Sequence, residues 1–237
     1  IGMAIAGRPV ITFGLDAPKQ ASDFGLIDAA KDAVLVQGDH VLLDMGDLKV
    51  AGSHNAANAL AAIAMASSIG LPMSPLLHGL REYEGEAHRV QSVSIIDGVE
   101  YIDDSKGTNV GATLAALNGL GDAGQRAKII LIAGGEGKGQ DFSPLADAVA
   151  RHAKAVILIG RDAPLIKQAL INTQVPLVDA SALDVAVQEA SKLAVSGDLI
   201  LLSPACASFD MFKDYAHRAQ VFIDAINELA TLNGQVS

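Results

Sequence analysis

Three short clusters in the second half of the sequence combine side chains that could bind an anion or move a proton. The first is Asp103-Asp104-Ser105-Lys106-Gly107-Thr108-Asn109, which offers carboxylates, a cation and hydroxyls. The second is Gly134-Gly135-Glu136-Gly137-Lys138-Gly139, and glycine amides beside a lysine are typical of a loop that cradles a phosphate. The third is Ser203-Pro204-Ala205-Cys206-Ala207-Ser208. Together they predict a site for an anionic ligand.

Each cluster also has a purely structural interpretation. Thr108 or Asn109 could cap the helix that follows, with Asp104 near its positive end, although capping leaves Lys106 unexplained. The glycine-rich loop could be a solvated turn, because it matches neither a Walker A motif nor G-x-G-x-x-G. Ser208 could cap the last helix. The residues alone leave these alternatives open.

Two further polar groups lie upstream. Arg89, directly after His88, could reach a phosphate bound between two domains, or the pair could be exposed linker residues. Asn55 and Asn58 are three residues apart, so on a helix they share a face and could contact a polar ring. Capping by Ser53 or Asn55 explains the same residues equally well.

Composition limits the classes of protein. Of the 237 residues, 50% are hydrophobic and 4% aromatic, which excludes a disordered or fibrous chain. The 17 basic and 27 acidic residues give a net charge of −10, so we expect no nucleic-acid partner. Residues 52–80 lack charged side chains but are rich in alanine and interrupted by polar residues, so we expect no membrane insertion.

The single cysteine, Cys206, excludes an internal disulfide and a cysteine metal cage, and it favours a cytoplasmic location. A small buried filler is its expected role, and thiol catalysis is a remote alternative. No cluster has the spacing of metal ligands.

The first part of the chain alternates short apolar runs with alanine-rich stretches. We expect antiparallel strands at residues 9–13, 34–37 and 41–43, with a turn at Gly38-Asp39, and helices at 56–69 and 74–81. Residues 83–86 break the apolar pattern. We therefore expect a domain boundary between residues 84 and 85.

The second part has the pattern of an α/β domain. Asp97-Gly98 predicts a hairpin between strands 93–96 and 99–102. Buried strands are expected at 129–133, 156–159, 177–178 and 199–202, and helices at 110–120, 145–150, 165–171, 185–193 and 209–229. Right-handed crossovers then give a doubly wound, mostly parallel sheet. Such sheets bind ligands at the carboxyl ends of their strands, where all three clusters fall.

With His54-Asn55-x-x-Asn58 and His88-Arg89 added, the three clusters occur in the order found in Mur ligases, and the sequence resembles this family over nearly its whole length. The resemblance implies that residues 1–84 are the C-terminal part of the mixed α/β central ATP-binding domain. Residues 85–237 would be the complete C-terminal, Rossmann-like domain that binds the amino acid. It also implies an ATP-dependent ligase that, with Mg²⁺, converts the carboxylate of UDP-N-acetylmuramoyl-L-alanine into an acyl phosphate, which D-glutamate attacks.

Residue roles follow from the same resemblance. Asn58 is expected on the adenine, Arg89 on the ATP phosphates and Asp104 on the ribose. Lys106, near the phosphates, and His88 are the expected catalytic residues. The family pattern places five residues around the amino acid: Thr108, Lys138, Ser208, Phe209 and Tyr215.

The resemblance also has gaps. Family members carry upstream a UDP-binding domain and a Gly-Lys-Thr or Gly-Lys-Ser phosphate loop with the main magnesium ligands, and this sequence contains none of them. We therefore expect the chain alone to be inactive. We also expect a monomer. Gly107 stands where family members usually have alanine, which we expect to reduce only helix rigidity. A noncatalytic nucleotide-binding or scaffolding module stays as the alternative, whereas a nicotinamide-dependent oxidoreductase lacks its glycine fingerprint.

Overall fold

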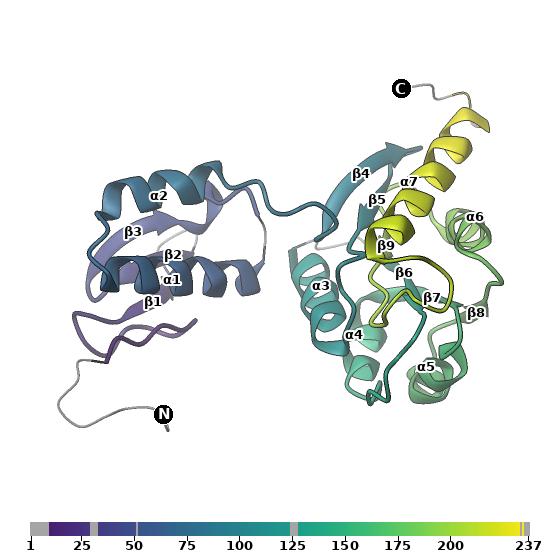
Figure 1. Cartoon of the computed structure of the whole chain (residues 1–237), viewed down its shortest axis with the longest axis horizontal. Coiled ribbons are helices and arrows are strands. Elements are labelled where there is room, and N and C mark those ends of the chain that lie inside the picture. Colours follow the sequence, from purple (N-terminus) through teal and green to yellow (C-terminus); the bar gives the residue numbers. More distant parts are fainter. Residues whose placement is uncertain (1–9, 29–32, 51, 124–127, 233, 235–237) are drawn as a thin grey trace. The chain divides into compact units, whose positions relative to one another are not determined.

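The computed structural model describes residues 10–28, 33–50, 52–123, 128–232 and 234 of the chain. It divides into two compact units between Gly85 and Glu86, one residue beyond the expected boundary (Figure 1). Each unit has a hydrophobic core of its own. No helix among the described residues is long and apolar enough to cross a membrane.

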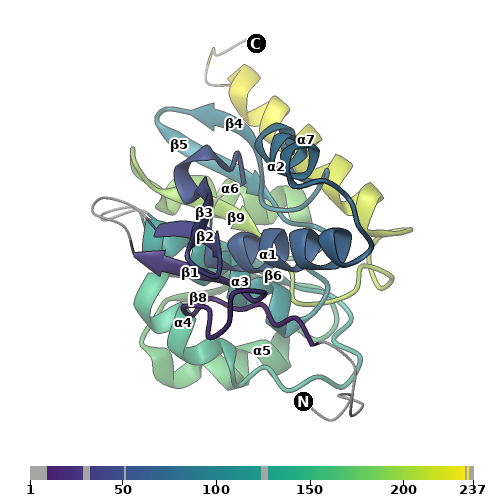
Figure 2. The same cartoon turned by 90° about the vertical axis from the view of Figure 1, so that its left-hand side faces the viewer.

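The first unit packs two helices on a small antiparallel sheet (Figure 2). Its elements are β1 (Phe24–Asp28), β2 (Ala33–Gln37), β3 (His40–Asp44), the short 3₁₀ helix Met45–Asp47, α1 (Ser53–Ser68) and α2 (Met73–Glu82). The strand order is β1-β2-β3. Leu35 of β2 and Leu60 and Ile63 of α1 are fully buried in the core between these layers.

In the first unit two expectations are wrong and one strand was not expected. The expected strand at 9–13 is not a strand over its described residues 10–13, and there only Phe13 pairs, in an isolated bridge to Phe24; residue 9 lies outside the described residues. Strand β1 was not predicted, because Gly25 and Asp28 interrupt its apolar run. Ser53 is the first residue of α1 and not its cap, since Gly52 takes that position without a side-chain hydrogen bond.

The second unit is a six-stranded sheet in the order β4-β5-β9-β6-β7-β8. Its strands are β4 (Gln91–Ile96), β5 (Val99–Asp103), β6 (Ile129–Gly134), β7 (Ala153–Ile159), β8 (Leu177–Asp179) and β9 (Leu199–Leu202). Strands β4 and β5 form the antiparallel hairpin, and all other pairs are parallel. The predicted fold class, a doubly wound and mostly parallel sheet with a hairpin, is confirmed.

Helices cover both faces of this sheet (Figure 1). Helices α3 (Val110–Ala123), α4 (Leu145–His152) and α5 (Ala163–Leu170), with the 3₁₀ helix Ile171–Thr173 after them, belong to one face, and α6 (Leu183–Leu193) and α7 (Tyr215–Leu232) to the other. Leu131 and Leu158 are buried toward the first group, and Ile130 and Ile157 toward the second. Alternate residues of one strand therefore fill two cores, which explains the uninterrupted apolar runs.

The last helix begins later than the expected residue 209. The amides of Met211 and Phe212 both donate to the carbonyl of Ser208, at 3.1 and 2.8 Å, and close a turn. Asp214 Oδ1 then accepts a 2.7 Å hydrogen bond from the His217 amide, so Asp214 caps α7 and Ser208 does not. At α3 the expected cap is confirmed, since Asn109 Oδ1 accepts from the Ala112 amide at 2.9 Å.

Candidate functional site

The three sequence clusters fall on loops at one edge of the six-stranded sheet. They follow the carboxyl ends of β5, β6 and β9, at residues 104–109, 135–144 and 203–214. Because β9 lies between β5 and β6 in a parallel arrangement, these loops leave the sheet side by side. The topology thus brings together segments about 100 residues apart in the sequence.

Hydrogen bonds between the loops fix this arrangement. Side-chain Nε2 of Gln140 donates to the carbonyls of Gly137 and Ala205, at 2.9 and 3.1 Å, and side-chain Oε1 accepts from the Val110 amide at 3.0 Å. The Ala205 amide donates to the Gly107 carbonyl at 3.0 Å. Lys106, Lys138 and Ser208 therefore stand on loops that are directly linked. Gln140 was missed as a site residue, because nothing in a lone glutamine indicates partners on two other loops.

The glycine-rich loop packs closely on the loop after β9. Gly135 has φ +125°, and a Cβ there would lie 2.4 Å from the Ala207 carbonyl oxygen, so only glycine fits. Glu136 and Ala207 exchange two backbone hydrogen bonds of 2.9 Å. Beyond them Lys138 is exposed, with φ +54°. Within the described part of the chain its ammonium group has no ion-pair or hydrogen-bond partner, so it is available to an anion.

Asp104 is buried and already engaged. Its Oδ2 accepts a 2.6 Å hydrogen bond from Ser203 Oγ, and its Oδ1 accepts a 3.3 Å bond from the Val90 amide. Ser203 Oγ also lies 3.0 Å from Thr113 Oγ1. Burial raises the pKa of Asp104 to about 6, against the lowering effect of these hydrogen bonds. A ribose contact would have to use the remaining lone pairs of this carboxylate.

Gly107 has a role that the sequence did not indicate. It precedes α3, so the expected loss of helix rigidity is wrong. A Cβ at this position would lie 2.4 Å from Asp104 Oδ2 and 3.0 Å from Ser203 Oγ. The absence of a side chain at Gly107 therefore makes room for the buried Asp104–Ser203 contact.

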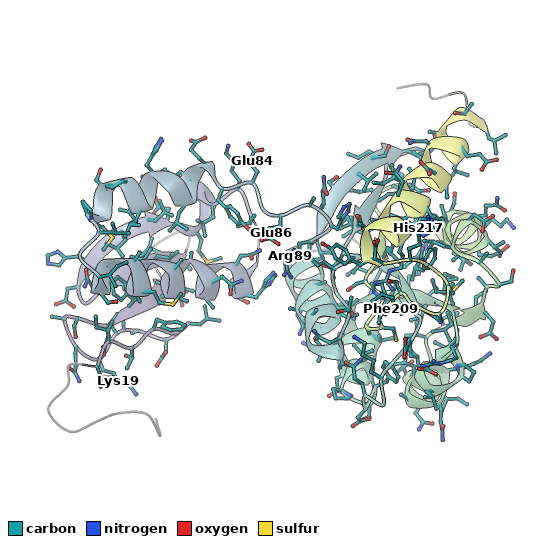
Figure 3. All side chains as sticks on the ribbon, in the orientation of Figure 1. Lys19, Glu84, Glu86, Arg89, Phe209 and His217 are labelled. Atoms are coloured by element: carbon teal, nitrogen blue, oxygen red, sulfur yellow. The ribbon has the colours of Figure 1, made fainter. Side chains whose placement is uncertain are left out.

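The two cations expected near the nucleotide phosphates share one carboxylate. Glu86 Oε2 lies 2.6 Å from Lys106 Nζ and 3.1 Å from Arg89 Nε. Figure 3 shows Glu86 and Arg89 close together on the segment that opens the second unit. Lys106 Nζ also lies 5.8 Å from the ring centre of Tyr215. Lys106 and Arg89 are thus near each other, as a shared anion requires.

The remaining predicted amino-acid contacts differ in exposure. Ser208 is buried, Thr108 is half-buried, and Phe209 is 66% exposed. Tyr215 begins α7, and its ring forms a T-shaped contact with the ring of His88, with ring centres 6.1 Å apart. Phe209 lies on the loop after β9 (Figure 3). These residues therefore lie at the same edge of the sheet.

A buried arginine that sequence reasoning missed connects two of the loops. Arg218 of α7 has no exposed surface; its Nη1 donates to the Cys206 carbonyl at 3.1 Å and its Nη2 to the Ser105 carbonyl at 2.7 Å. Burial lowers its pKa to about 10. No carboxylate among the described residues forms an ion pair with it.

Other expectations concern single residues. Cys206 is buried, and burial raises the pKa of its thiol to about 12, so it is the expected filler and no nucleophile.

Asn58 is exposed on α1 of the first unit, and burial lowers the pKa of nearby His54. Among the described residues, no group of three or more His, Cys, Asp or Glu side chains could hold a metal ion.

Comparison with known proteins relates this geometry to one family. The family model "Mur ligase, glutamate ligase domain" matches residues 88–206. Two curated proteins named UDP-N-acetylmuramoylalanine--D-glutamate ligase, from Polaromonas sp. strain JS666 and Burkholderia ambifaria, are 51% and 52% identical over 97% and 98% of this chain. The chain spans 42% and 50% of their lengths, which is about half.

Solved structures agree at the level of the fold. The crystal structure of UDP-N-acetylmuramate-alanine ligase MurC from Thermotoga maritima matches 86% of this chain with a TM-score of 0.63 and 21% sequence identity. The match covers 46% of the MurC chain.

Proposed function

Because this chain belongs to the Mur ligase family, we propose that it supplies the amino-acid-binding domain, and the end of the ATP-binding domain, of a D-glutamate-adding ligase. The reaction joins D-glutamate to UDP-N-acetylmuramoyl-L-alanine during assembly of peptidoglycan precursors and converts ATP to ADP. The curated relatives carry the name of this activity. ATP and Mg²⁺ are the proposed cofactors, with the main magnesium ligands and the phosphate loop outside this chain, which alone is inactive.

One observation carries the proposal most directly. Lys138, without a partner among the described side chains, extends from a glycine-rich loop that is hydrogen-bonded to the loop of Ser208. A chain of net charge −10 repels glutamate, so local cations must hold its carboxylates. We assign Lys138, Thr108, Ser208, Phe209 and Tyr215 to D-glutamate.

The chain's residues would contribute binding and charge neutralisation to the chemistry. ATP activates the substrate carboxylate as an acyl phosphate when the complete enzyme is assembled. Arg89 and Lys106 would offset phosphate charge, Asp104 would contact the ribose, and Asn58 the adenine. Holding the amine of D-glutamate beside the activated carbonyl makes their reaction effectively intramolecular.

Binding of D-glutamate to this chain tests the proposal. In a titration followed by amide NMR signals, D-glutamate should shift the signals of residues 135–140 and 205–210, and L-glutamate should shift them less. Lys138→Ala should weaken binding about tenfold or more. Lys128→Ala is the matched control, because Lys128 precedes β6 at the opposite edge and donates to the Arg151 carbonyl.

In the full-length parent enzyme, the same substitution should raise the KM for D-glutamate strongly. An unchanged KM in Lys138→Ala, or equal losses in Lys138→Ala and Lys128→Ala, would contradict the assignment. Loss of D-glutamate binding with unchanged nucleotide binding would support it.

A further inference from the structure

His88 and Asp103 form a hydrogen-bonded pair that the sequence did not indicate. His88 Nδ1 lies 2.7 Å from Asp103 Oδ2. The Asp103 side chain has no exposed surface, whereas the imidazole is 26% exposed. Asp103 ends β5, and His88 precedes β4, so the pair connects the entry of the unit to the candidate site.

The chemistry of a carboxylate fixes the direction of this hydrogen bond. An ionised carboxylate only accepts, so the imidazole must donate from Nδ1. The other oxygen of Asp103 accepts from the Ser105 amide at 2.9 Å, which holds the carboxylate in place. The neutral ring therefore carries its proton on Nδ1 and its lone pair on Nε2. Within the described residues, Nε2 has no hydrogen-bond partner.

The backbone of His88 is attached to the same loop. Its carbonyl accepts from the Lys106 amide at 3.0 Å, and its amide donates to Gln91 Oε1 at 3.1 Å. These contacts hold His88 at φ +65°, in the left-handed region. Both the ring and the backbone of His88 are thus hydrogen-bonded to residues at and after the end of β5, and its ring contacts Tyr215.

We propose that Asp103 is a positioning residue that holds His88 as the Nδ1–H tautomer, so that Nε2 accepts a hydrogen bond from an N–H or O–H group of a ligand bound at this edge. The role of the pair in ligand binding rests on the proposed function. The tautomer itself does not, because it follows from contacts within the second unit.

The chain contains an internal reference for the test. His217 Nδ1 accepts a 3.2 Å hydrogen bond from the Lys213 amide, so its neutral ring must carry the proton on Nε2. In nitrogen-15 NMR spectra of the whole chain, at a pH where both rings are neutral, His88 and His217 should therefore show opposite tautomers. An Nε2–H tautomer at His88 in the wild-type chain would overturn the proposal, and this measurement needs no variant.

Substitutions then test the role of Asp103. Asp103→Leu should convert His88 to the Nε2–H tautomer, which neutral histidine prefers in water, and leave His217 unchanged. Asp97→Asn removes the same charge from the exposed hairpin turn and should change neither ring. If Asp103→Leu folds and His88 keeps its proton on Nδ1, Asp103 is not what sets the tautomer.

Added ADP separates this inference from the proposed function. ADP should shift the signals of Arg89 and Lys106 together with the Nε2 resonance of His88. Shifts at Arg89 and Lys106 without a change at Nε2 would overturn the acceptor role while supporting nucleotide binding. The absence of any shift would contradict the proposed nucleotide contacts and, with them, the ligand role of Nε2, and would leave the tautomer assignment standing.

Discussion

Buried polar groups at the two edges of the six-stranded sheet differ in their hydrogen bonding. The amino edge is where the parallel strands begin, and the carboxyl edge is where they end. At the amino edge, Asp198 accepts from Lys154 Nζ at 2.7 Å and from the Val195 amide at 2.9 Å. At the carboxyl edge, Ser105 Oγ, Arg218 Nε and Asp210 Oδ1 are buried with no hydrogen-bond partner among the described residues. Unpaired buried polar atoms cost stability. The buried carboxylate Asp198 of the amino edge is thus fully engaged, whereas the carboxyl edge retains costly groups where ligands are expected.

The largest expected effect concerns Arg218. Arg218→Ala removes two hydrogen bonds from a charged group and leaves two buried carbonyls unpaired, so it should lower the free energy of unfolding by about 4 kcal/mol. Arg151→Ala is the control, because Arg151 is exposed on α4 and its loss should cost at most about 0.5 kcal/mol. Urea unfolding followed through the amide signals of β6 and β9 measures both. Equal losses would mean that the buried guanidinium does not hold the loops.

The next effect is a dependence of stability on pH. As the pH rises, Asp104 at the carboxyl edge should lower stability, whereas Asp198 at the amino edge should raise it. Asp104 has a pKa of about 6 when folded against 3.8 in the unfolded chain, so the folded state binds the proton more tightly. Its contribution should lower stability by about 2–3 kcal/mol as the pH rises from about 4 to 6. Asp104→Asn should remove this loss, as seen in unfolding curves across that range.

At Asp198, burial raises the pKa, but the Lys154 ammonium group and the Val195 amide together lower it below 3.8. Ionised Asp198 therefore stabilises the folded state above pH 4, and this stabilisation is lost as the pH falls through the lowered pKa. Asp198→Asn should flatten only this acidic part of the curve. If both variants changed the same pH range, the contrast between the edges would be wrong.

Gly107→Ala tests the pH dependence that Asp104 confers, and it should lower stability less than the changes above. A Cβ 2.4 Å from Asp104 Oδ2 should push the carboxylate away from Ser203, with a stability loss of about 1 kcal/mol. The displaced carboxylate becomes solvated, so the loss of stability between pH 4 and 6 should shrink. Gly111→Ala in α3, where the nearest atom is Asn109 Oδ1 at 3.3 Å, should keep the full pH dependence. An unchanged pH dependence in Gly107→Ala would show that Asp104 stays in place.

Sequence reasoning succeeded where local pattern decides the structure. Uninterrupted apolar runs identified the parallel strands, and Asp97-Gly98 identified the hairpin. It also located the loops of the candidate site, because topology places them at the carboxyl ends of strands. It failed for the start of α7, because the apolar residues Phe209, Met211 and Phe212 continue a helix-like pattern through what is a turn.

The partners of buried polar groups could not be read from the sequence. Arg218 contacts a carbonyl 113 residues away, and Ser203 contacts a carboxylate 99 residues away. No periodicity encodes such pairs, and arginine on an amphipathic helix normally indicates an exposed position. In the sequence Asp103 and Asp104 are simply neighbouring carboxylates, and only the geometry shows that Asp103 contacts His88 while Asp104 contacts Ser203.

The smallest expected effect concerns Glu86, which links Lys106 and Arg89 at distances of 2.6 and 3.1 Å. This exposed carboxylate competes with any anion for the two cations, whereas Lys154 and Asp198 form a fixed pair at the other edge. Glu86→Gln should strengthen binding of pyrophosphate about threefold at low salt, followed through the Lys106 amide signal. Glu84→Gln is the control, because Glu84 pairs with Lys49 in the first unit. Equal affinities in both variants would mean that Glu86 does not compete, and that the carboxyl edge is open to anions without its displacement.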